Sequence, residues 1–215
     1  MSIDILERRI NRMKSVIAKR QYDLTVILEN VHDPHNIGAV MRTCDSIGIN
    51  EIFILYTEPR LQEGGLKIGL NSSSGAGQWV KVNYYECMEA CFNEVKKRFN
   101  HIFGTAIGPE SSDLYALDLT SSCAMLFGNE HSGISTQAMQ YVDQNFLIPQ
   151  YGFVQSLNIS VACAISLYEA ARQRSLDNQY DRAFGDHPRD HNRLNDYIQI
   201  HQQKKLNKIN NKKIF

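Results

Sequence analysis

Long apolar runs are missing from the 215-residue sequence, and none approaches the roughly 20 residues that a membrane-spanning helix needs. The first 20 residues carry six Lys or Arg and two acids, too charged for a secretory signal and too acidic for a mitochondrial transit peptide. We therefore expect a soluble, cytoplasmic protein. The length suits one sizeable α/β domain with extensions, and no internal repeat is present.

Sequence patterns for metals and nucleotides are also missing. The five cysteines include no CxxC pair, and their odd number fits reduced, mostly buried thiols. His187 and His191 are four residues apart, but Pro188 lies between them and no carboxylate completes a ligand set, so we predict no metal site. The loop Gly128–Gly133 lacks the lysine of a P-loop, and the absence of GxGxxG disfavours a dinucleotide-binding oxidoreductase.

Charge is balanced in total but unevenly distributed. The formal net charge is zero, yet residues 21–170 contain seven bases and sixteen acids. Residues 204–215 contain five lysines and no acid, and the N-terminal segment is also basic. Two basic ends therefore flank an acidic middle, and such ends either approach a phosphate backbone or serve as solubilising tails.

Short apolar runs alternate with segments of helical spacing. Amphipathic spacing predicts a helix over 3–18, and longer helices over 158–176 and 191–206 follow the last apolar run. Strands are predicted at 24–29, 51–56, 101–107, 123–128 and 145–149, and shorter helices at 38–48, 86–99 and 135–142. Strands separated by helices predict a mostly parallel sheet that is covered on both faces.

Three polar loops follow predicted strands, where ligands of open parallel sheets collect. In the first, Asn36 stands at a helix entrance whose free amides can hold an anion, and Arg42 follows about one turn beyond Gly38. In the second, Glu130 lies between two glycines and either bonds a ligand hydroxyl or pins the loop. Taken alone, Asn36 is equally a helix cap, and Arg42 is equally a solvated side chain.

The third loop places Ser156, Leu157 and Asn158 at the mouth of a buried helix. Either polar residue is able to cap that helix, and Leu157 is expected to pack inward. Taken alone, this loop indicates only a capped helix.

Together the three loops resemble the signature motifs of the SPOUT methyltransferases, specifically the TrmH-type tRNA guanosine 2′-O-methyltransferases. The motifs occur in the same order and read NVHDPHNIGAVMRTCD (30–45), LFGNEHSGIS (126–135) and IPQYGFVQSLNISVACAISLYEA (148–170). The resemblance covers nearly the whole chain, including the basic N-terminal helix and the segments SSSGAGQWVKV and YEAARQR.

This resemblance implies an α/β fold with a deep trefoil knot, contrary to the general rule that chains avoid knots. Periodicity alone predicts only the parallel sheet. We expect a basic N-terminal helical extension (1–20), a SPOUT catalytic domain (21–176, with the knot at about 123–176) and a C-terminal helical extension with a basic tail (177–215). Enzymes of this type work as homodimers and require no metal.

The cofactor implied by the resemblance is S-adenosylmethionine, bent inside the knot and held largely by backbone groups. An adenine pocket needs apolar walls and a few fixed polar groups, and Leu157 is the expected wall. The implied cofactor-binding residues are Leu126, Phe127, Gly128, Asn129, Ile148, Ser156 and Leu157.

The implied reaction is methyl transfer to a ribose 2′-hydroxyl, which the protein must position and help to deprotonate. The implied catalytic residues are Arg42, as the central one, with Asn36, Glu130, Ser156 and Asn158. Some accounts of the family make the arginine a general base. A guanidinium is rarely deprotonated in a protein. We therefore favour a role in which Arg42 stays protonated, binds a neighbouring phosphate and stabilises a developing alkoxide.

The implied partner is tRNA, gripped mainly by basic side chains at the two ends. The candidates are Arg8, Arg9, Arg12, Lys19, Arg20, His35, Arg172 and Arg174, and for His35 a structural role is the alternative. One departure from the family pattern is Gln150, where an apolar residue, often methionine, is common.

The expected substrate is the D-loop guanosine, position 18 of tRNA. The alternatives are a SPOUT enzyme that methylates ribosomal RNA or another tRNA ribose, and a non-catalytic tRNA-binding or folding module. Minimal wobble-position enzymes lack long terminal extensions, and many ribosomal RNA enzymes carry a larger N-terminal domain for which this chain has no room. The complete set of Asn36, Arg42, Glu130, Ser156 and Asn158 disfavours the non-catalytic module.

Overall fold

The computed structural model describes residues 3–69, 73, 75–108 and 110–212. Contacts divide the chain into two units, one of residues 21–177 and one that combines residues 1–20 with 178–215. Ser72 and Ser74 of the segment SSSGAGQWVKV and residues 213–215 of the predicted basic tail lie outside the described residues. Within the described residues, no helix has both the length and the apolar character to cross a membrane.

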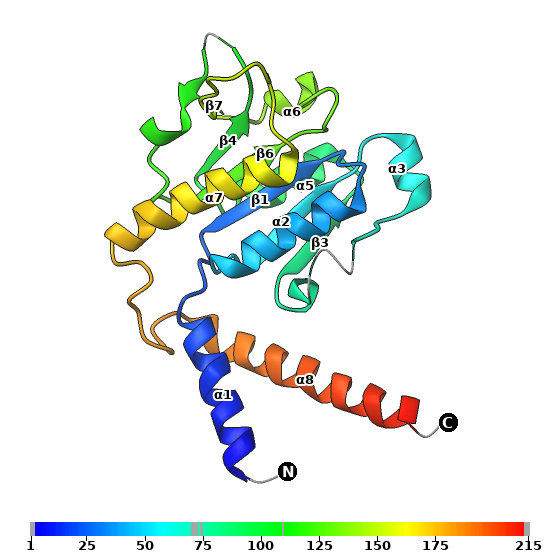
Figure 1. The fold of residues 1–215 in the computed structure, drawn as a ribbon, viewed down its shortest axis with the longest axis vertical. Helices are drawn as coiled ribbons and strands as arrows, with labels where there is room; N and C mark the ends of the chain where they lie inside the picture. The colour runs from blue at the N-terminus through cyan, green and yellow to red at the C-terminus, as the bar shows by residue number, and fades with distance from the viewer. Residues whose placement is uncertain (1–2, 70–72, 74, 109, 213–215) are drawn as a thin grey trace. The chain divides into compact units, whose positions relative to one another are not determined.

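A seven-stranded sheet forms the centre of the larger unit (Figure 1). Its order is β3-β2-β1-β6-β4-β7-β5, and every pairing is parallel. The strands are β1 (Leu24–Glu29), β2 (Glu51–Leu55), β3 (Lys81–Tyr85), β4 (His101–Thr105), β5 (Ser112–Asp113), β6 (Cys123–Phe127) and β7 (Gln144–Leu147). The parallel sheet is therefore confirmed.

Helices cover both faces of this sheet, as predicted. Figure 1 shows α2 (Pro34–Ser46) and α7 (Ile159–Leu176) side by side on one face, with α5 (Met88–Lys96) behind. Val26 and Leu28 of β1 pack in the core cluster that contains α2 and α7. Ile27 points to the opposite side and packs with α5 and with α6 (Thr136–Met139), because neighbouring strand residues face opposite sides of a sheet. Short helical segments α3 (Pro59–Gly64), η1 (Ala76–Gln78) and η2 (Leu114–Ala116) also belong to this unit.

Several predicted boundaries differ from the structure. Helix α2 begins four residues earlier than predicted, because Pro34 suits the first helical position and the Asp33 carboxylate accepts a hydrogen bond from the His35 amide (2.8 Å). Asn36 therefore lies inside the first turn and is not the cap. Helix α7 begins directly after Asn158, whose side chain accepts from the Ser160 amide (2.9 Å), so Asn158 is the cap of this helix. The prediction missed strands β3 and β5.

The smaller unit is built from α1 (Ile3–Ile17) and α8 (Asp190–Lys212), which contact each other. Nε of Arg20 donates to the hydroxyl of Tyr197 (2.9 Å), and Arg182 pairs with the buried Asp190 (2.7 Å). The first contact joins the segment after α1 to α8, and the second joins the segment before α8 to the first residue of that helix.

Candidate active site

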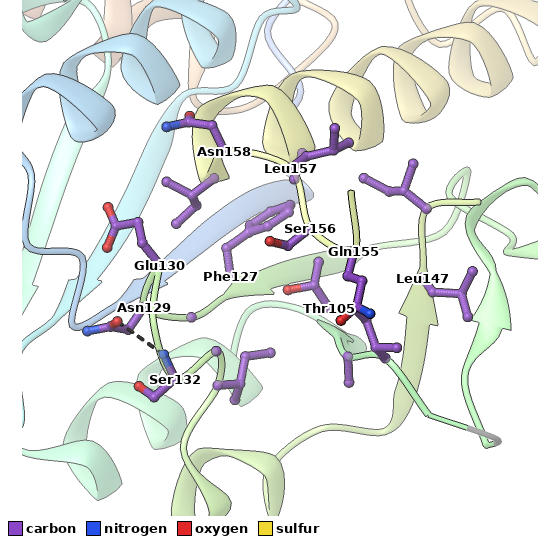
Figure 2. A pocket seen from close by; sticks show the side chains of 18 of the residues that line it. Thr105, Phe127, Asn129, Glu130, Ser132, Leu147, Gln155, Ser156, Leu157 and Asn158 are labelled. Atoms are coloured by element: carbon purple, nitrogen blue, oxygen red, sulfur yellow. Dashed lines mark hydrogen bonds between the residues drawn. The ribbon is translucent and has the colours of Figure 1, made fainter. Parts of the chain in front are cut away.

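A cavity of about 1110 Å³ opens where strands β4, β6 and β7 end (Figure 2). Three loops line it, with residues from 105–107, 127–134 and 147–158. Parallel strands bring their carboxyl ends to the same edge of a sheet, and the loops that follow neighbouring strands therefore meet there. The cavity is large enough for a ligand of nucleoside size or more.

Most of the predicted cofactor-binding residues line this cavity. They are Phe127, Gly128, Asn129, Ile148, Ser156 and Leu157. Leu126 is the exception, because its side chain is fully buried among the core residues that pack against α5. The lining also includes Thr105, Ala106 and Ile107, which were not predicted, because small and apolar residues after a strand carry no chemical signal in the sequence.

A chain of hydrogen bonds joins the polar residues of the three motifs. The amide nitrogen of the Asn36 side chain donates to Glu130 Oε1 (2.8 Å), and its oxygen accepts from the Asn158 side chain (3.2 Å). Glu130 and Asn158 line the cavity, whereas Asn36 reaches them from α2. The structure thus brings together three of the five predicted catalytic residues, which lie up to 122 positions apart in the sequence.

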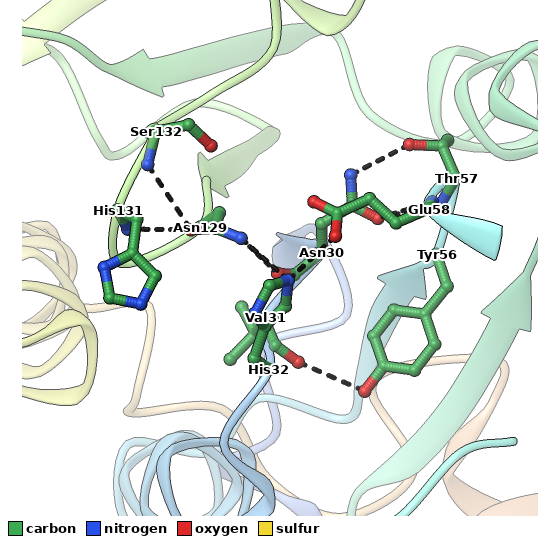
Figure 3. Close-up of polar contacts among 9 residues, drawn as sticks. All are labelled: Asn30, Val31, His32, Tyr56, Thr57, Glu58, Asn129, His131 and Ser132. Atoms are coloured by element: carbon green, nitrogen blue, oxygen red, sulfur yellow. Dashed lines mark hydrogen bonds and ion pairs between the residues drawn. The ribbon is translucent and has the colours of Figure 1, made fainter. Parts of the chain in front are cut away.

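The loop after β6 is shaped by Asn129, which is buried. Its side-chain oxygen accepts from the amides of His131 (2.7 Å) and Ser132 (3.3 Å), and its side-chain nitrogen donates to the carbonyl of Asn30 (3.1 Å) (Figure 3). The backbones of Asn129 and Gly133 also exchange two hydrogen bonds of 3.0 and 2.9 Å. These contacts close the loop tightly and turn its backbone toward the cavity.

His32 extends this network on its outer side. Its Nε2 lies 2.9 Å from the side-chain nitrogen of Asn129 and 3.0 Å from Oε2 of Glu58. No role for His32 or Glu58 could be predicted from the sequence, because the segments that hold them are separate until the sheet forms. One ring nitrogen either accepts from Asn129 or donates to Glu58, so His32 ties the loop after β1 either to the Gly128–Gly133 loop or to the loop after β2.

Arg42 and His35 lie on the exposed side of α2, and neither lines the cavity. Arg42 lies six positions after Asn36 in the helix, so their side chains point about 120° apart around the helix axis. Arg42 forms no hydrogen bond or ion pair with any residue that the structure describes. Its guanidinium is therefore available to an anion that approaches from outside.

The cysteines play no part in the site. All five are free, and all except Cys87 are buried. Burial raises the pKa of Cys91 and of Cys123 to about 12, so both thiols stay protonated at neutral pH. The prediction of mostly buried, unpaired thiols is confirmed. No cluster of three His, Cys, Asp or Glu suited to a metal occurs within the described residues.

Two of the predicted tRNA-binding residues, Arg174 and Arg20, are buried, and their assignment to tRNA stays a prediction. Arg174 is 0% exposed, and its guanidinium donates to Asp23, Gln21 and two backbone carbonyls. Arg20 is 2% exposed and bonds Tyr197. Neither guanidinium is able to reach a phosphate without breaking these contacts.

The other basic candidates remain at the surface. Arg8, Arg9, Arg12 and Lys19 are exposed on or just after α1. Arg172 is exposed on α7 and makes two hydrogen bonds of 2.8 Å to the carboxylate of Glu169. The hydrogen bonds from Arg172 hold the pKa of Glu169 below its usual value.

Residues 23–168 match the SpoU rRNA Methylase family, and the chain belongs to this family. A relative from Thermus thermophilus, a tRNA (guanosine(18)-2′-O)-methyltransferase, is 39% identical over 176 residues, which span 82% of this chain and 88% of that protein. A protein of the same name from Escherichia coli is 35% identical, over 81% of this chain and 74% of its own length.

Solved structures give the same classification. The TrmH/SpoU tRNA modifying enzyme of A. aeolicus superposes with a TM-score of 0.80 at 32% identity, covering 93% of this chain and 98% of that one. The SpoU methyltransferase AviRb from Streptomyces viridochromogenes, solved in complex with AdoMet, gives a TM-score of 0.63 at 25% identity, over 73% of this chain and 62% of that one.

Proposed function

We propose that this protein transfers the methyl group of S-adenosylmethionine to the ribose 2′-hydroxyl of guanosine 18 in the D-loop of tRNA. The observation that carries the proposal is its similarity to tRNA (guanosine(18)-2′-O)-methyltransferases, at 35–39% identity over more than four fifths of the chain. The hydrogen-bonded set of Asn36, Glu130 and Asn158 supports it, because it joins the three sequence motifs at one cavity.

The cavity suits S-adenosylmethionine in its size and its lining. Phe127, Ile148 and Leu157 offer apolar walls for adenine, while the backbone of the Gly128–Gly133 loop and the side chain of Ser156 offer polar groups. Gly128 lets the backbone of Gly133 and Ile134 approach closely within the loop, since it carries no side chain. The bound cofactor supplies an electrophilic methyl group, so the protein residues need only hold and orient the two reactants.

The roles of the polar residues follow from their positions. Glu130 and Asn158 face the cavity and are placed to orient the ribose hydroxyl, while Asn36 fixes both of them. The exposed position of Arg42 on α2 suits contact with the phosphate beside that ribose, while its stabilisation of the developing alkoxide is proposed from the family resemblance and not from its position. The exposed bases of α1 and Arg172 attract the tRNA backbone.

The finer features implied by the family resemblance belong to the same proposal. We propose that residues from about 123 to 176 form the trefoil knot, and that the cytoplasmic enzyme is a homodimer. The three cavity loops and α7 lie largely within the knot segment, which supports the first point. Val161 and Tyr168, exposed on α7, form a surface that a second subunit is able to cover.

The test is transfer of labelled methyl from S-adenosylmethionine to unmodified tRNA transcripts, followed by mapping of the modified nucleotide. We expect 2′-O-methylguanosine at position 18. A transcript with 2′-deoxyguanosine at that position should accept no label, since it lacks the acceptor oxygen. Label at another ribose, or in ribosomal RNA, would show that the substrate is not guanosine 18 of tRNA. Binding of tRNA and S-adenosylhomocysteine without transfer would indicate a non-catalytic module.

Replacement of Gly128 by alanine should weaken cofactor binding. A Cβ at this position would lie 2.1 Å from the backbone carbon of Gly133 and 2.2 Å from the nitrogen of Ile134, so the loop would have to open. We expect the affinity for S-adenosylhomocysteine, measured by calorimetry, to fall about tenfold or more, or roughly 1.4 kcal/mol. Gly64→Ala is the matched control, because a Cβ there meets no atom within 4 Å. Equal affinity in both variants would contradict the proposed loop geometry.

Gln150 carries a buried polar atom that the fold leaves unsatisfied. Its side-chain oxygen has no hydrogen-bond partner among the described residues, and its nitrogen makes one long bond of 3.4 Å to the carbonyl of Gln155. Methionine has a similar length and no such acceptor. We therefore expect Gln150→Met to raise the free energy of unfolding of the ligand-free protein by about 1 kcal/mol in urea titrations. Gln137→Met, at an exposed position, should leave stability nearly unchanged, and a less stable Gln150→Met protein would contradict the prediction.

A further inference from the structure

Large apolar side chains are exposed at the rim of the cavity. Tyr151 is 96% and Phe153 107% exposed, and Ile107 on the facing loop is 77% exposed. Single exposed apolar residues are normal on a protein surface, but grouped aromatic rings beside a ligand cavity indicate a contact surface. The fold gives these rings nothing to pack against in the described part of the chain.

The loop that carries the rings alternates between two sides. Gln150, Gly152 and Val154 line the cavity, whereas Tyr151 and Phe153 do not. The two aromatic rings therefore point away from the space assigned to the cofactor, and their contact must be with something that docks from outside.

The chemistry of this surface suits a nucleobase better than a phosphate. No charged residue occurs from Gln144 to Tyr168, so the loop offers no partner for an anion. Aromatic rings stack on unpaired bases, which is how proteins commonly hold single-stranded nucleotides. In a ribose, the carbon that bears the base is bonded to the carbon that bears the 2′-hydroxyl. When a ribose lies at the mouth of the cavity, its own base or the base of the neighbouring nucleotide therefore lies at the rim.

We propose that Tyr151 and Phe153 stack on nucleobases of the RNA substrate, at or beside the methylated nucleotide, and hold that nucleotide out of the folded loop. This assignment rests on the proposed function, because it requires a ribose at the cavity. The two rings contact substrate and not cofactor, and they fix the base while Glu130 and Asn158 fix the hydroxyl. A lid over the cofactor and an interface with a second copy of the chain are the competing occupants.

The test compares the full-length protein with the double variant Tyr151→Ala/Phe153→Ala. Methyl transfer to the tRNA transcript should show a KM for tRNA raised about tenfold or more, from the loss of base stacking. The affinity for S-adenosylhomocysteine and the sedimentation behaviour should not change. The conservative variants Tyr151→Phe and Phe153→Tyr should keep a near-normal KM. Leu176→Ala is the matched control, since this residue is exposed at the far end of α7.

Each other outcome overturns the proposal in a recognisable way. A fall in cofactor affinity alone would make the loop a cofactor lid, and a change in sedimentation would make it a subunit interface. An unchanged KM for tRNA would remove any role in substrate binding. If the unmodified protein transfers no methyl to any RNA, the proposed function itself fails. A direct readout is ultraviolet crosslinking of tRNA that contains 6-thioguanosine at position 18, which should map by mass spectrometry to Tyr151 or Phe153.

Discussion

Arg174→Ala is expected to lower the free energy of unfolding by about 3 kcal/mol, the typical cost of breaking a buried charged network. The Arg174 guanidinium donates to the carbonyls of Leu119 (2.9 Å) and Ser121 (2.8 Å) and to the side chains of Gln21 and Asp23. Asp23 is about half exposed, so water compensates much of that ion pair. The larger loss comes from the carbonyls, because a buried acceptor without a donor costs about 1–3 kcal/mol.

The matched control is Arg172→Ala, two residues earlier in the same helix. Arg172 is exposed, and its pair with Glu169 is of the surface type, which contributes at most about 1 kcal/mol. Urea titrations should therefore separate the two variants clearly. In tRNA binding the larger effect should come from Arg172→Ala, which should lower the affinity for tRNA at low salt while the fold stays intact. Equal stability of the two variants would contradict the structural role of Arg174.

The two arginines also show that composition alone does not predict which basic side chains are exposed. Both belong to the basic segment YEAARQR, and composition treats them alike. Residues two apart in a helix point about 200° apart, so one faces the interior of the larger unit and the other faces solvent. Which side is interior depends on how α7 packs against the loops before β1 and β6, and no local pattern encodes that. Counting charges therefore cannot distinguish Arg172, at the surface, from Arg174, in the interior.

Other parts of the fold were readable from local signals. Apolar runs such as LTVILE and CAMLF predicted the central strands, because a strand buried on both faces has to be apolar. Strand β3 (KVNYY) was missed, since it is the partly exposed edge strand of the sheet and carries polar residues. The pair Asp33-Pro34 is a readable start signal for α2, and its use would have placed Asn36 inside the helix from the outset.

The candidate site was predictable in its members but not in its contacts. The motifs identified Asn36, Glu130 and Asn158, whereas the hydrogen bonds among them require three loops to meet at one sheet edge. The supporting contacts of His32 and Glu58 carry no motif and emerge only from the fold. The proposed catalytic residues belong to recognisable motifs, while the residues that hold them in place often do not.

Replacement of Arg42 by alanine is expected to have the largest effect on catalysis, a fall of about 10²–10³ in the turnover number, the size typical for loss of one group that stabilises transition-state charge. The affinity for S-adenosylhomocysteine should stay the same, because Arg42 does not line the cavity. Stability should also change little, since Arg42 is exposed and makes no hydrogen bond or ion pair with the described residues. Single-turnover methyl transfer at saturating tRNA measures the chemical step directly.

Two further variants define what the side chain does. Lys97→Ala is the control for loss of an exposed positive charge, because α5 lies on the opposite face of the sheet from α2, and its turnover should be normal. Arg42→Lys keeps the charge but loses the planar fork that binds a phosphate through two hydrogen bonds, so we expect turnover between those of the alanine variant and the unmodified protein. Full turnover by Arg42→Lys at neutral pH would show that charge alone suffices. A turnover as low as that of Arg42→Ala would show that the geometry of the guanidinium, and not its charge, carries the rate.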